Sequence, residues 1–206
     1  MLKAINDKSK LRELYSSPKK AALEKTQYIL DEHSRRFIAA SPFLILGTHG
    51  DVSPRGDNPG FVKVLDDNTL IIPDRNGNNR LDSMNNILTD STVALIFLIP
   101  GISETFRIRG EAEISTDPIV LESLSLNKKK PHSALIIHVR EAYIHCAKAI
   151  VRSNLWEKTA KQDPLKFGAT NIFAAHINRK PDEYTASYND DIKISMAEEG
   201  RSAKNE

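Results

Sequence analysis

The sequence is poor in cysteine and aromatic residues, and it has no long apolar run. Its single cysteine, Cys146, cannot form an intrachain disulfide, which favours a reducing compartment. The longest apolar run, residues 93–99, is far too short to span a bilayer. Residues 1–10 also lack the apolar core of a secretory signal. We therefore expect a cytoplasmic protein that does not enter the membrane.

An excess of charge of one sign is missing as well. The chain has 29 Lys and Arg residues against 27 Asp and Glu residues, which gives a net charge of +2, and it has no basic tail. Aromatic residues make up only 6% of the chain and are not interleaved with the cations. This pattern is not typical of nucleic-acid binding, so we expect no nucleic-acid partner.

Several motifs that identify common enzyme classes are also absent. No G-x-G-x-x-G motif follows an expected strand and no Walker loop is present, which argues against a dinucleotide or P-loop site. The sequence has no H-E-x-x-H motif and no paired C-x-x-C motifs, so we expect no metal site. No G-x-S-x-G elbow of a serine hydrolase occurs.

The apolar residues that are present predict a mainly β protein with flanking helices. Residues 1–41 have helical spacing and end at Ser41-Pro42. Short apolar or alternating runs follow, which are typical of strands. We expect strands at 43–48, 61–65, 69–72, 92–98, 104–114 and 134–144, a loop at 51–60, and helices at 79–88, after 117–118, and at 146–162.

Six strands with short connections favour a small antiparallel barrel, because closure removes exposed sheet edges. The fold class that we expect is therefore a six-stranded antiparallel split β-barrel with flanking helices. We divide the chain into an N-terminal helical segment (1–41), a barrel with a closing helix (42–163) and a C-terminal extension (164–206). The extension is charged from Met196 onward and is expected to be partly disordered.

The polar stretch 72–83 is the first candidate for a functional site. It places Arg75 and Arg80 between the end of a strand and the start of a helix, and Arg55 belongs to another expected loop. The free N–H groups of a helix N-terminus and the guanidinium groups both suit a phosphate. The same residues also suit ordinary solvated turns, in which Asn and Gly supply positive φ angles. Residues alone leave both interpretations open.

A second candidate is the repeat of Lys148, Arg152 and Trp156 at four-residue spacing. On a helix these side chains share one face, where two cations and an indole ring can hold a planar anionic ligand. The alternative is a solvated helix face on which the long side chains cover apolar surface.

Several segments, taken together and in order, resemble one known family. They are 48–51, 53–57, 60–62, 64–67, 70–75, 77–80, 82–83, 86–87 and 105–110, followed by 146–149 and 152–156. This set resembles the FMN-binding split barrel of the pyridoxamine 5′-phosphate oxidase superfamily, and its last two segments are similar to one subgroup of that superfamily.

The resemblance implies a homodimer with two FMN molecules at the interface and an FMN-dependent oxidoreductase that acts on a small-molecule substrate or electron donor. It implies that Arg55 and Arg80 hold the FMN phosphate, that 74–75 meets the flavin through backbone and polar groups, and that Thr105 contacts the flavin ring. Lys148, Arg152 and Trp156 would reach across from the second subunit. The cofactor-binding residues implied in this way are Arg55, Asp74, Arg75, Asn79, Arg80, Thr105, Lys148, Arg152 and Trp156.

The sequence departs from the true oxidases of this family in one respect. They use a C-terminal Arg–His pair on the substrate, and His176 and Arg179 do not match its order or surroundings. Oxidation of vitamin B6 is therefore not favoured, and the substrate stays open. Three further alternatives remain: a non-enzymatic flavin-binding protein, a split barrel that binds a deazaflavin, and one that binds haem through His49, His138 or His145.

Overall fold

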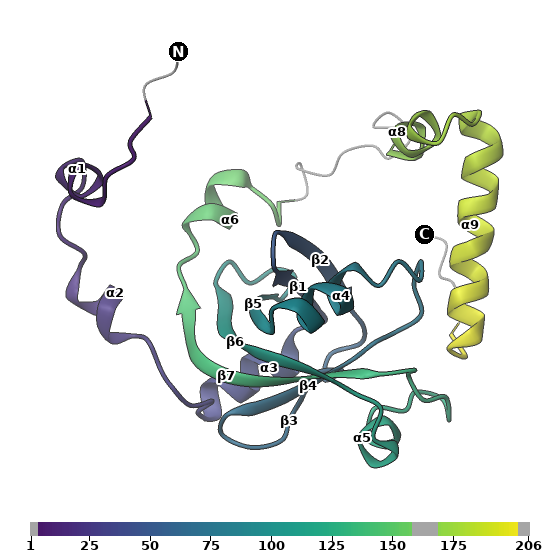
Figure 1. Cartoon of the computed structure of the whole chain (residues 1–206), viewed down its shortest axis with the longest axis horizontal. Helices are drawn as coiled ribbons and strands as arrows, with labels where there is room; N and C mark the ends of the chain where they lie inside the picture. The colour runs from purple at the N-terminus through teal and green to yellow at the C-terminus, as the bar shows by residue number, and fades with distance from the viewer. Residues whose placement is uncertain (1–3, 158–168, 202–206) are drawn as a thin grey trace.

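A computed structural model describes residues 4–157 and 169–201 and contains one antiparallel sheet of seven strands (Figure 1). Along the sheet the strands are ordered β2-β1-β5-β6-β7-β4-β3. The strands are β1 (Phe43–Thr48), β2 (Asp51–Gly56), β3 (Lys63–Val64), β4 (Thr69–Pro73), β5 (Thr92–Leu98), β6 (Thr105–Ser115) and β7 (Ala134–His145). The helices are α1 (Lys8–Glu13), α2 (Lys20–Glu24), α3 (Glu32–Ala40), α4 (Asp82–Thr89), α5 (Pro118–Ser123), α6 (Lys148–Ser153), α8 (Ala169–His176) and α9 (Pro181–Glu198).

The mainly β class with flanking helices is confirmed, but the sheet has seven strands and not six. Residues 51–56, which we expected in a loop, form strand β2 and pair antiparallel with β1 from Phe43↔Gly56 to Thr48↔Asp51. The hairpin turn contains Gly50 at a φ of 73°, a conformation that favours glycine. Pro54 is tolerated because β2 is an edge strand, where no N–H needs to be donated on the outer side.

The core fills the inner face of the sheet. In β6 the expected alternation is confirmed, since Phe106, Ile108 and Ala112 are buried. Gly110 continues this inner row at a β-bulge, where an added Cβ would lie 2.2 Å from the His138 carbonyl oxygen, so only glycine fits. Helices α3 and α4 cover the same core with buried side chains such as Ile38, Met84 and Ile87.

The N-terminal segment has two parts that behave differently. Residues 4–24, with α1 and α2, are all exposed and project away from the sheet (Figure 1). The following residues attach to the sheet: Gln27 and Ala142 exchange two backbone hydrogen bonds of 2.9 and 2.8 Å, and the Leu30 N–H donates to Asp67 O at 2.7 Å. Leu30 and helix α3 are thus the parts of the N-terminal segment that pack on the core.

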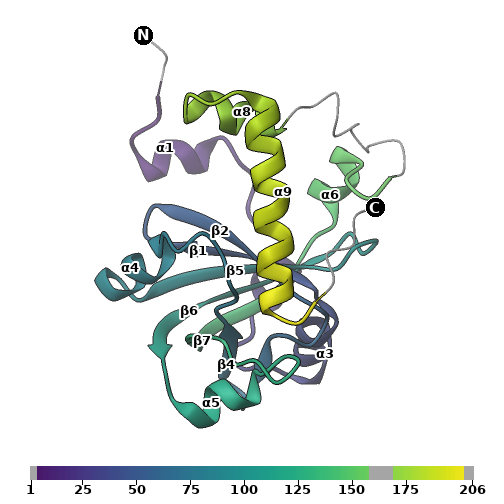
Figure 2. The ribbon, with the colours of Figure 1, turned by 90° about the vertical axis from the view of Figure 1, so that its right-hand side faces the viewer.

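The C-terminal segment contains helices α8 and α9, which the sequence pattern did not indicate. Figure 2 shows α9 running beside the barrel, with its C-terminal end near the sheet. Part of the segment that we expected to be disordered from Met196 is described: α9 extends to Glu198, and Arg201 pairs with Asp57. Residues 202–206 lie outside the described residues.

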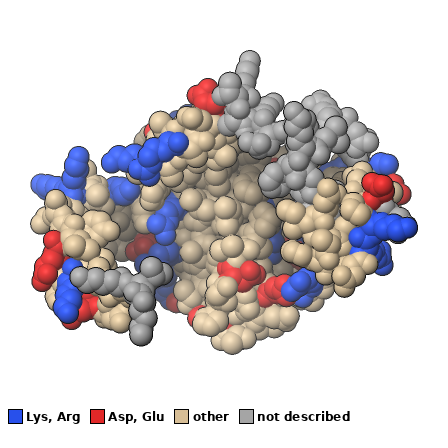
Figure 3. Space-filling model, turned by 90° about the horizontal axis from the view of Figure 1, so that it is seen from above, with Lys and Arg blue, Asp and Glu red and all other residues tan. Residues whose placement is uncertain are grey.

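Charged side chains are unevenly distributed over the surface. Figure 3 shows a face with a largely uncharged centre, and Lys and Arg side chains gather toward its margins. Within residues 4–157 and 169–201, no helix combines the length and apolar character that crossing a bilayer requires.

Candidate functional site

The principal candidate site is a cleft at the seam where the sheet fails to close. Strand β2 is one end of the sheet, and the loop that follows β4, near the other end, faces it across the cleft. The cleft has a volume of about 630 Å³, within the range of roughly 300–1,000 Å³ that is usual for ligand pockets. Its lining comes from residues 51–55, 74–75 and 77–84.

Strand β2 supplies one wall. Because side chains alternate along a strand, Asp51, Ser53 and Arg55 point to the same side, and all three line the cleft. The Ser53 hydroxyl lies 2.9 Å from the Ser83 hydroxyl, which ties this wall to α4. Arg55 donates to the carbonyl of Pro54 at 3.0 Å, and no carboxylate of the described residues lies within ion-pair distance of it. The Arg55 guanidinium is therefore available to an anion in the cleft.

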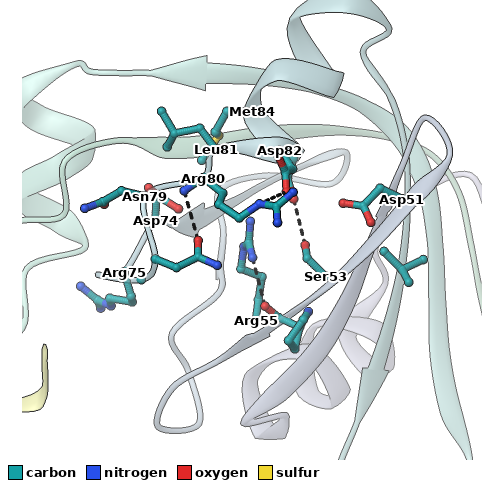
Figure 4. Close-up of a pocket in the computed structure, with 15 residues that line it drawn as sticks. Asp51, Ser53, Arg55, Asp74, Arg75, Asn79, Arg80, Leu81, Asp82 and Met84 are labelled. Carbon is teal, nitrogen blue, oxygen red and sulfur yellow. Dashed lines mark hydrogen bonds and ion pairs between the residues drawn. The ribbon is translucent and has the colours of Figure 1, made fainter. Parts of the chain in front are cut away.

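The opposite wall is the loop that leads into α4. Asn79 and Leu81 have left-handed φ angles of 57° and 61°, which is unusual for a leucine and gives the loop a sharp, strained course. Leu81 occupies the N-cap position of α4 without a side-chain hydrogen bond, so the first-turn N–H groups of α4 have no side-chain cap from it. Arg80 lies between these residues and points into the cleft (Figure 4). This wall combines a cation with the positive end of a helix dipole.

Carboxylates also line the cleft, and they limit what it can bind. Asp82 forms an exposed ion pair with Arg80 at 2.9 Å. Asp74 is half-buried, and this burial raises its pKa, although the charges of Arg55 and His132 oppose the shift. A ligand in this cleft must therefore place its anionic group toward Arg55 and Arg80 and accommodate Asp74 as a protonatable neighbour.

Arg75 lines the same cleft, but its side chain is bound elsewhere. Its Nε lies 2.8 Å from Asp57 Oδ2, and its Nη1 donates to the Leu124 carbonyl at 3.1 Å. In Figure 4 the Arg75 side chain points away from Arg55 and Arg80. The guanidinium of Arg75 thus anchors the loop.

The structure brings Arg55, Asp74, Arg75, Asn79 and Arg80 together in the cleft, whereas the other expected residues lie outside its lining. Thr105 is buried at the start of β6, opposite His145 of β7. Lys148 and Arg152 are exposed on α6. The Trp156 indole N–H donates to the Ile102 carbonyl at 2.8 Å.

The expected helical stripe of Lys148, Arg152 and Trp156 is wrong at its last member. Helix α6 ends at Ser153, because Asn154 takes a left-handed φ of 52° and caps it. Trp156 therefore lies beyond the helix, and residues 158–162 of the expected helix are outside the described residues.

Sequence reasoning did not single out Ser53 and Ser83, which link the two walls, or Leu81, which is exposed at the cleft. No local signal marked Ser53, because Pro54 and the glycines at 50 and 56 are typical of loops.

Several solved structures are similar to about half of the chain. Among solved structures, HupZ of Group A Streptococcus is 19% identical, with a TM-score of 0.44 over 55% of this chain and 92% of that one. An FMN-binding protein from Syntrophomonas wolfei is 10% identical, with a TM-score of 0.40 over 54% and 88%. A Clostridium acetobutylicum protein related to general stress protein 26, of the pyridoxinephosphate oxidase family, is 15% identical, with a TM-score of 0.40 over 55% and 85%.

No curated protein matches the chain. A family model described as pyridoxamine 5′-phosphate oxidase matches residues 30–146, which contain all seven strands and the whole lining of the cleft. This match spans more than half of the 206 residues, and the chain belongs to the pyridoxamine 5′-phosphate oxidase family.

Proposed function

We propose that the protein binds FMN in the seam cleft and acts as an FMN-dependent oxidoreductase, with the flavin at a homodimer interface. The observation that carries the proposal is the pair Arg55 and Arg80. They come from opposite walls, β2 and the loop before α4, and meet at one cleft beside the α4 N-terminus. A phosphomonoester carries close to two negative charges at neutral pH, which this arrangement of donors suits.

The residues present fit such a cofactor. The volume of about 630 Å³ accommodates a ligand of this size. Within the proposal, Arg55 and Arg80 hold the phosphate, and the backbone of 74–75 with Asn79 orients the rest of the molecule. Asp82 pairs with Arg80 at 2.9 Å, so the phosphate competes with this carboxylate for the Arg80 guanidinium.

Bound FMN would supply the electron or hydride transfer, and the protein supplies binding and electrostatics. Asp74 would hold a proton at its carboxyl oxygen more readily than an exposed aspartate, because burial raises its pKa. The electron donor and the substrate remain to be found by screening.

The second subunit enters the proposal through α6. Lys148 and Arg152 are exposed and lie outside the cleft lining of their own chain, which is consistent with a role toward the cofactor of a partner. The haem alternative has less support. None of the three candidate ligands lines the seam cleft: His49, His138 and His145. His49 Nδ1 lies 3.6 Å from Asp90 Oδ2, and His138 Nε2 lies 3.1 Å from Glu113 Oε1.

The experiment that tests the proposal is a titration of the purified protein with FMN and, separately, with riboflavin, followed by flavin absorbance and fluorescence. We expect FMN to bind more tightly than riboflavin, because only FMN carries the phosphate. Arg80→Ala should weaken FMN binding by about 1–3 kcal/mol and leave riboflavin binding unchanged. Arg140→Ala is the matched control, since Arg140 is also an exposed arginine paired with a carboxylate, Glu111, but lies outside the cleft lining.

Failure of the wild-type protein to retain FMN would overturn the proposal, and a Soret band in the purified protein would replace it with haem binding. Equal losses for FMN and riboflavin would remove the phosphate assignment. Tight FMN binding without turnover, after a screen of nicotinamide and small-molecule donors, would favour the non-enzymatic flavin-binding alternative.

A further inference from the structure

The C-terminal end of α9 and the residues after it return to the back of the loop that forms the cleft. We call residues 198–201 the C-terminal clasp. Figure 1 shows the loop between β4 and α4 reaching toward α9. The clasp and this loop are far apart in the sequence. Hydrogen bonds and ion pairs between their polar side chains and backbone groups join them.

The first set of contacts is made to Asn76. The Asn76 backbone N–H donates to Glu199 Oε1 at 3.1 Å, and its side-chain amide donates to Glu198 Oε2 at 2.9 Å. Asn76 does not line the seam cleft, although its neighbours in the loop do. The two carboxylates therefore hold the loop from behind and leave its cleft side open.

The second set centres on Asp57, whose side chain is only 2% exposed. Asp57 Oδ2 lies 2.8 Å from Arg75 Nε, and its Oδ1 lies 2.5 Å from Arg201 Nη2. Arg201 Nε is also 3.1 Å from Glu199 Oε2. One buried carboxylate thus joins the clasp to the loop residue Arg75, and Glu199 closes the network.

The third set fixes the course of the clasp itself. The Asn127 side-chain amide donates to the carbonyls of Glu199 and Gly200 at 3.2 and 2.9 Å, and Lys129 Nζ donates to Ala197 O at 3.2 Å. Gly200 has a φ of 70°, and an added Cβ would lie 3.0 Å from Asn127 Cβ. The close approach of the two segments, at Gly200 and Asn127, favours glycine.

Apolar packing does not explain why this end of the chain is held. Tyr188, Ile192 and Ile194 of α9 are all exposed, so the helix does not bury these side chains against the barrel. The attachment includes polar contacts concentrated at the clasp, and they reach the loop at Asn76 and, through Asp57, at Arg75. This arrangement fits a positioning role better than a role in the core.

We propose that Arg201 and Glu199 are positioning residues, which fix the 74–81 loop from behind in the conformation that binds the phosphate-bearing ligand. The proposal rests on the proposed FMN function for its ligand, but its structural claim concerns the loop alone. A loop that is already ordered loses less conformational entropy when the ligand binds, so loss of the clasp should weaken binding. Neither residue lines the seam cleft, so neither touches the ligand in it.

The test uses the full-length protein and the variants Arg201→Ala and Glu199→Ala, with FMN as the probe. Both variants should lower FMN affinity by about tenfold. The two substitutions change the net charge in opposite directions, so a long-range electrostatic effect on anionic FMN would weaken binding in Arg201→Ala and strengthen it in Glu199→Ala. Positioning weakens binding in both. Lys193→Ala removes a cation of α9 that pairs only with Asp190 among the described residues, and it should leave FMN affinity unchanged.

A second measurement separates this proposal from the proposed function. Amide hydrogen exchange of residues 74–81, measured without any ligand, should be faster in Arg201→Ala and Glu199→Ala than in the wild-type protein and in Lys193→Ala. Faster exchange in a protein that never binds FMN would support the clasp's hold on the loop and overturn the flavin site. Unchanged exchange together with unchanged FMN affinity would overturn the clasp, and opposite changes in affinity would replace it with an electrostatic effect.

Discussion

The seam cleft and the region around α6 both present cations, but the two regions are built differently. In the cleft, Arg55 and Arg80 come from separate elements. The loop that carries Arg80 is anchored by the ion pair of Arg75 with the buried Asp57. On α6, Lys148 and Arg152 are exposed on a helix of six residues, and neither forms an ion pair with any residue that the structure describes. The cleft is a concave site within one chain, whereas α6 presents cations outward, as a surface for a second molecule would.

Removing the charge of Asp57, the carboxylate that anchors the loop, tests this comparison most severely. Asp57→Asn should lower the free energy of unfolding at pH 7 by about 3 kcal/mol, because the partly buried guanidinium groups of Arg75 and Arg201 lose their shared anion. Urea denaturation followed by circular dichroism measures this loss. Asp82→Asn, which affects only an exposed ion pair in the same cleft, should change stability by less than about 1 kcal/mol. Similar losses of unfolding free energy in Asp57→Asn and Asp82→Asn would contradict the role of Asp57 as the anchor of the loop.

The pH dependence of the same variant has a defined sign. Burial acts to raise the pKa of Asp57, but the ion pair with Arg201 and the hydrogen bonds from the Asn58 N–H and Arg75 outweigh it, and the pKa is lowered below its usual value of 3.8. A carboxyl with a lowered folded-state pKa stabilises the protein above the unfolded-state pKa, and this contribution is lost as the pH falls through the folded-state value. The stability difference between wild type and Asp57→Asn should therefore be constant near neutrality and shrink below about pH 3.8.

The next largest effect concerns the two cleft arginines together. If Arg55 and Arg80 bind one phosphate, the double variant should lose less FMN binding energy than the sum of the single variants, each about 1–3 kcal/mol. A double-mutant cycle from FMN titrations measures the difference. Strict additivity would indicate that the two side chains act on separate groups.

A smaller effect is expected from Trp156→Phe on the α6 side. The change removes the hydrogen bond from the indole N–H to the Ile102 carbonyl and should cost about 1 kcal/mol of unfolding free energy. Thermal unfolding measures it, with Tyr15→Phe on the exposed N-terminal segment as the control. An unchanged free energy of unfolding in Trp156→Phe would mean that the indole does not stabilise the segment that follows α6.

The smallest effect on stability is expected for Arg152→Ala, below about 0.5 kcal/mol, because its side chain is exposed. Its effect on FMN binding should depend on protein concentration and appear only where sedimentation shows a dimer. Weaker FMN binding in a dilute, monomeric sample would show instead that Arg152 acts within its own chain.

The strands and the position of the phosphate-suited loop could be predicted from the sequence because their signals are local. The alternation of Phe106, Ile108 and Ala112 predicted β6 and its buried face. The edge strand β2 was missed, because Pro54 and the neighbouring glycines are typical of loops, and only pairing with β1 makes 51–56 a strand. Helix α6 was predicted too long for a similar reason: the spacing of its cations continues past Asn154, but the backbone does not.

The sequence by itself determined that this protein is mainly β and that Arg75 and Arg80 lie in a polar loop between a strand and a helix, since residue type and spacing are properties of neighbouring positions. Only the tertiary structure decided that Arg55 and Arg80 share a cleft while Arg75, from the same loop as Arg80, turns back to Asp57. It also decided that Arg201 reaches the same carboxylate. The direction of a charged side chain depends on which distant group neutralises it, and that group is defined only when the chain has folded.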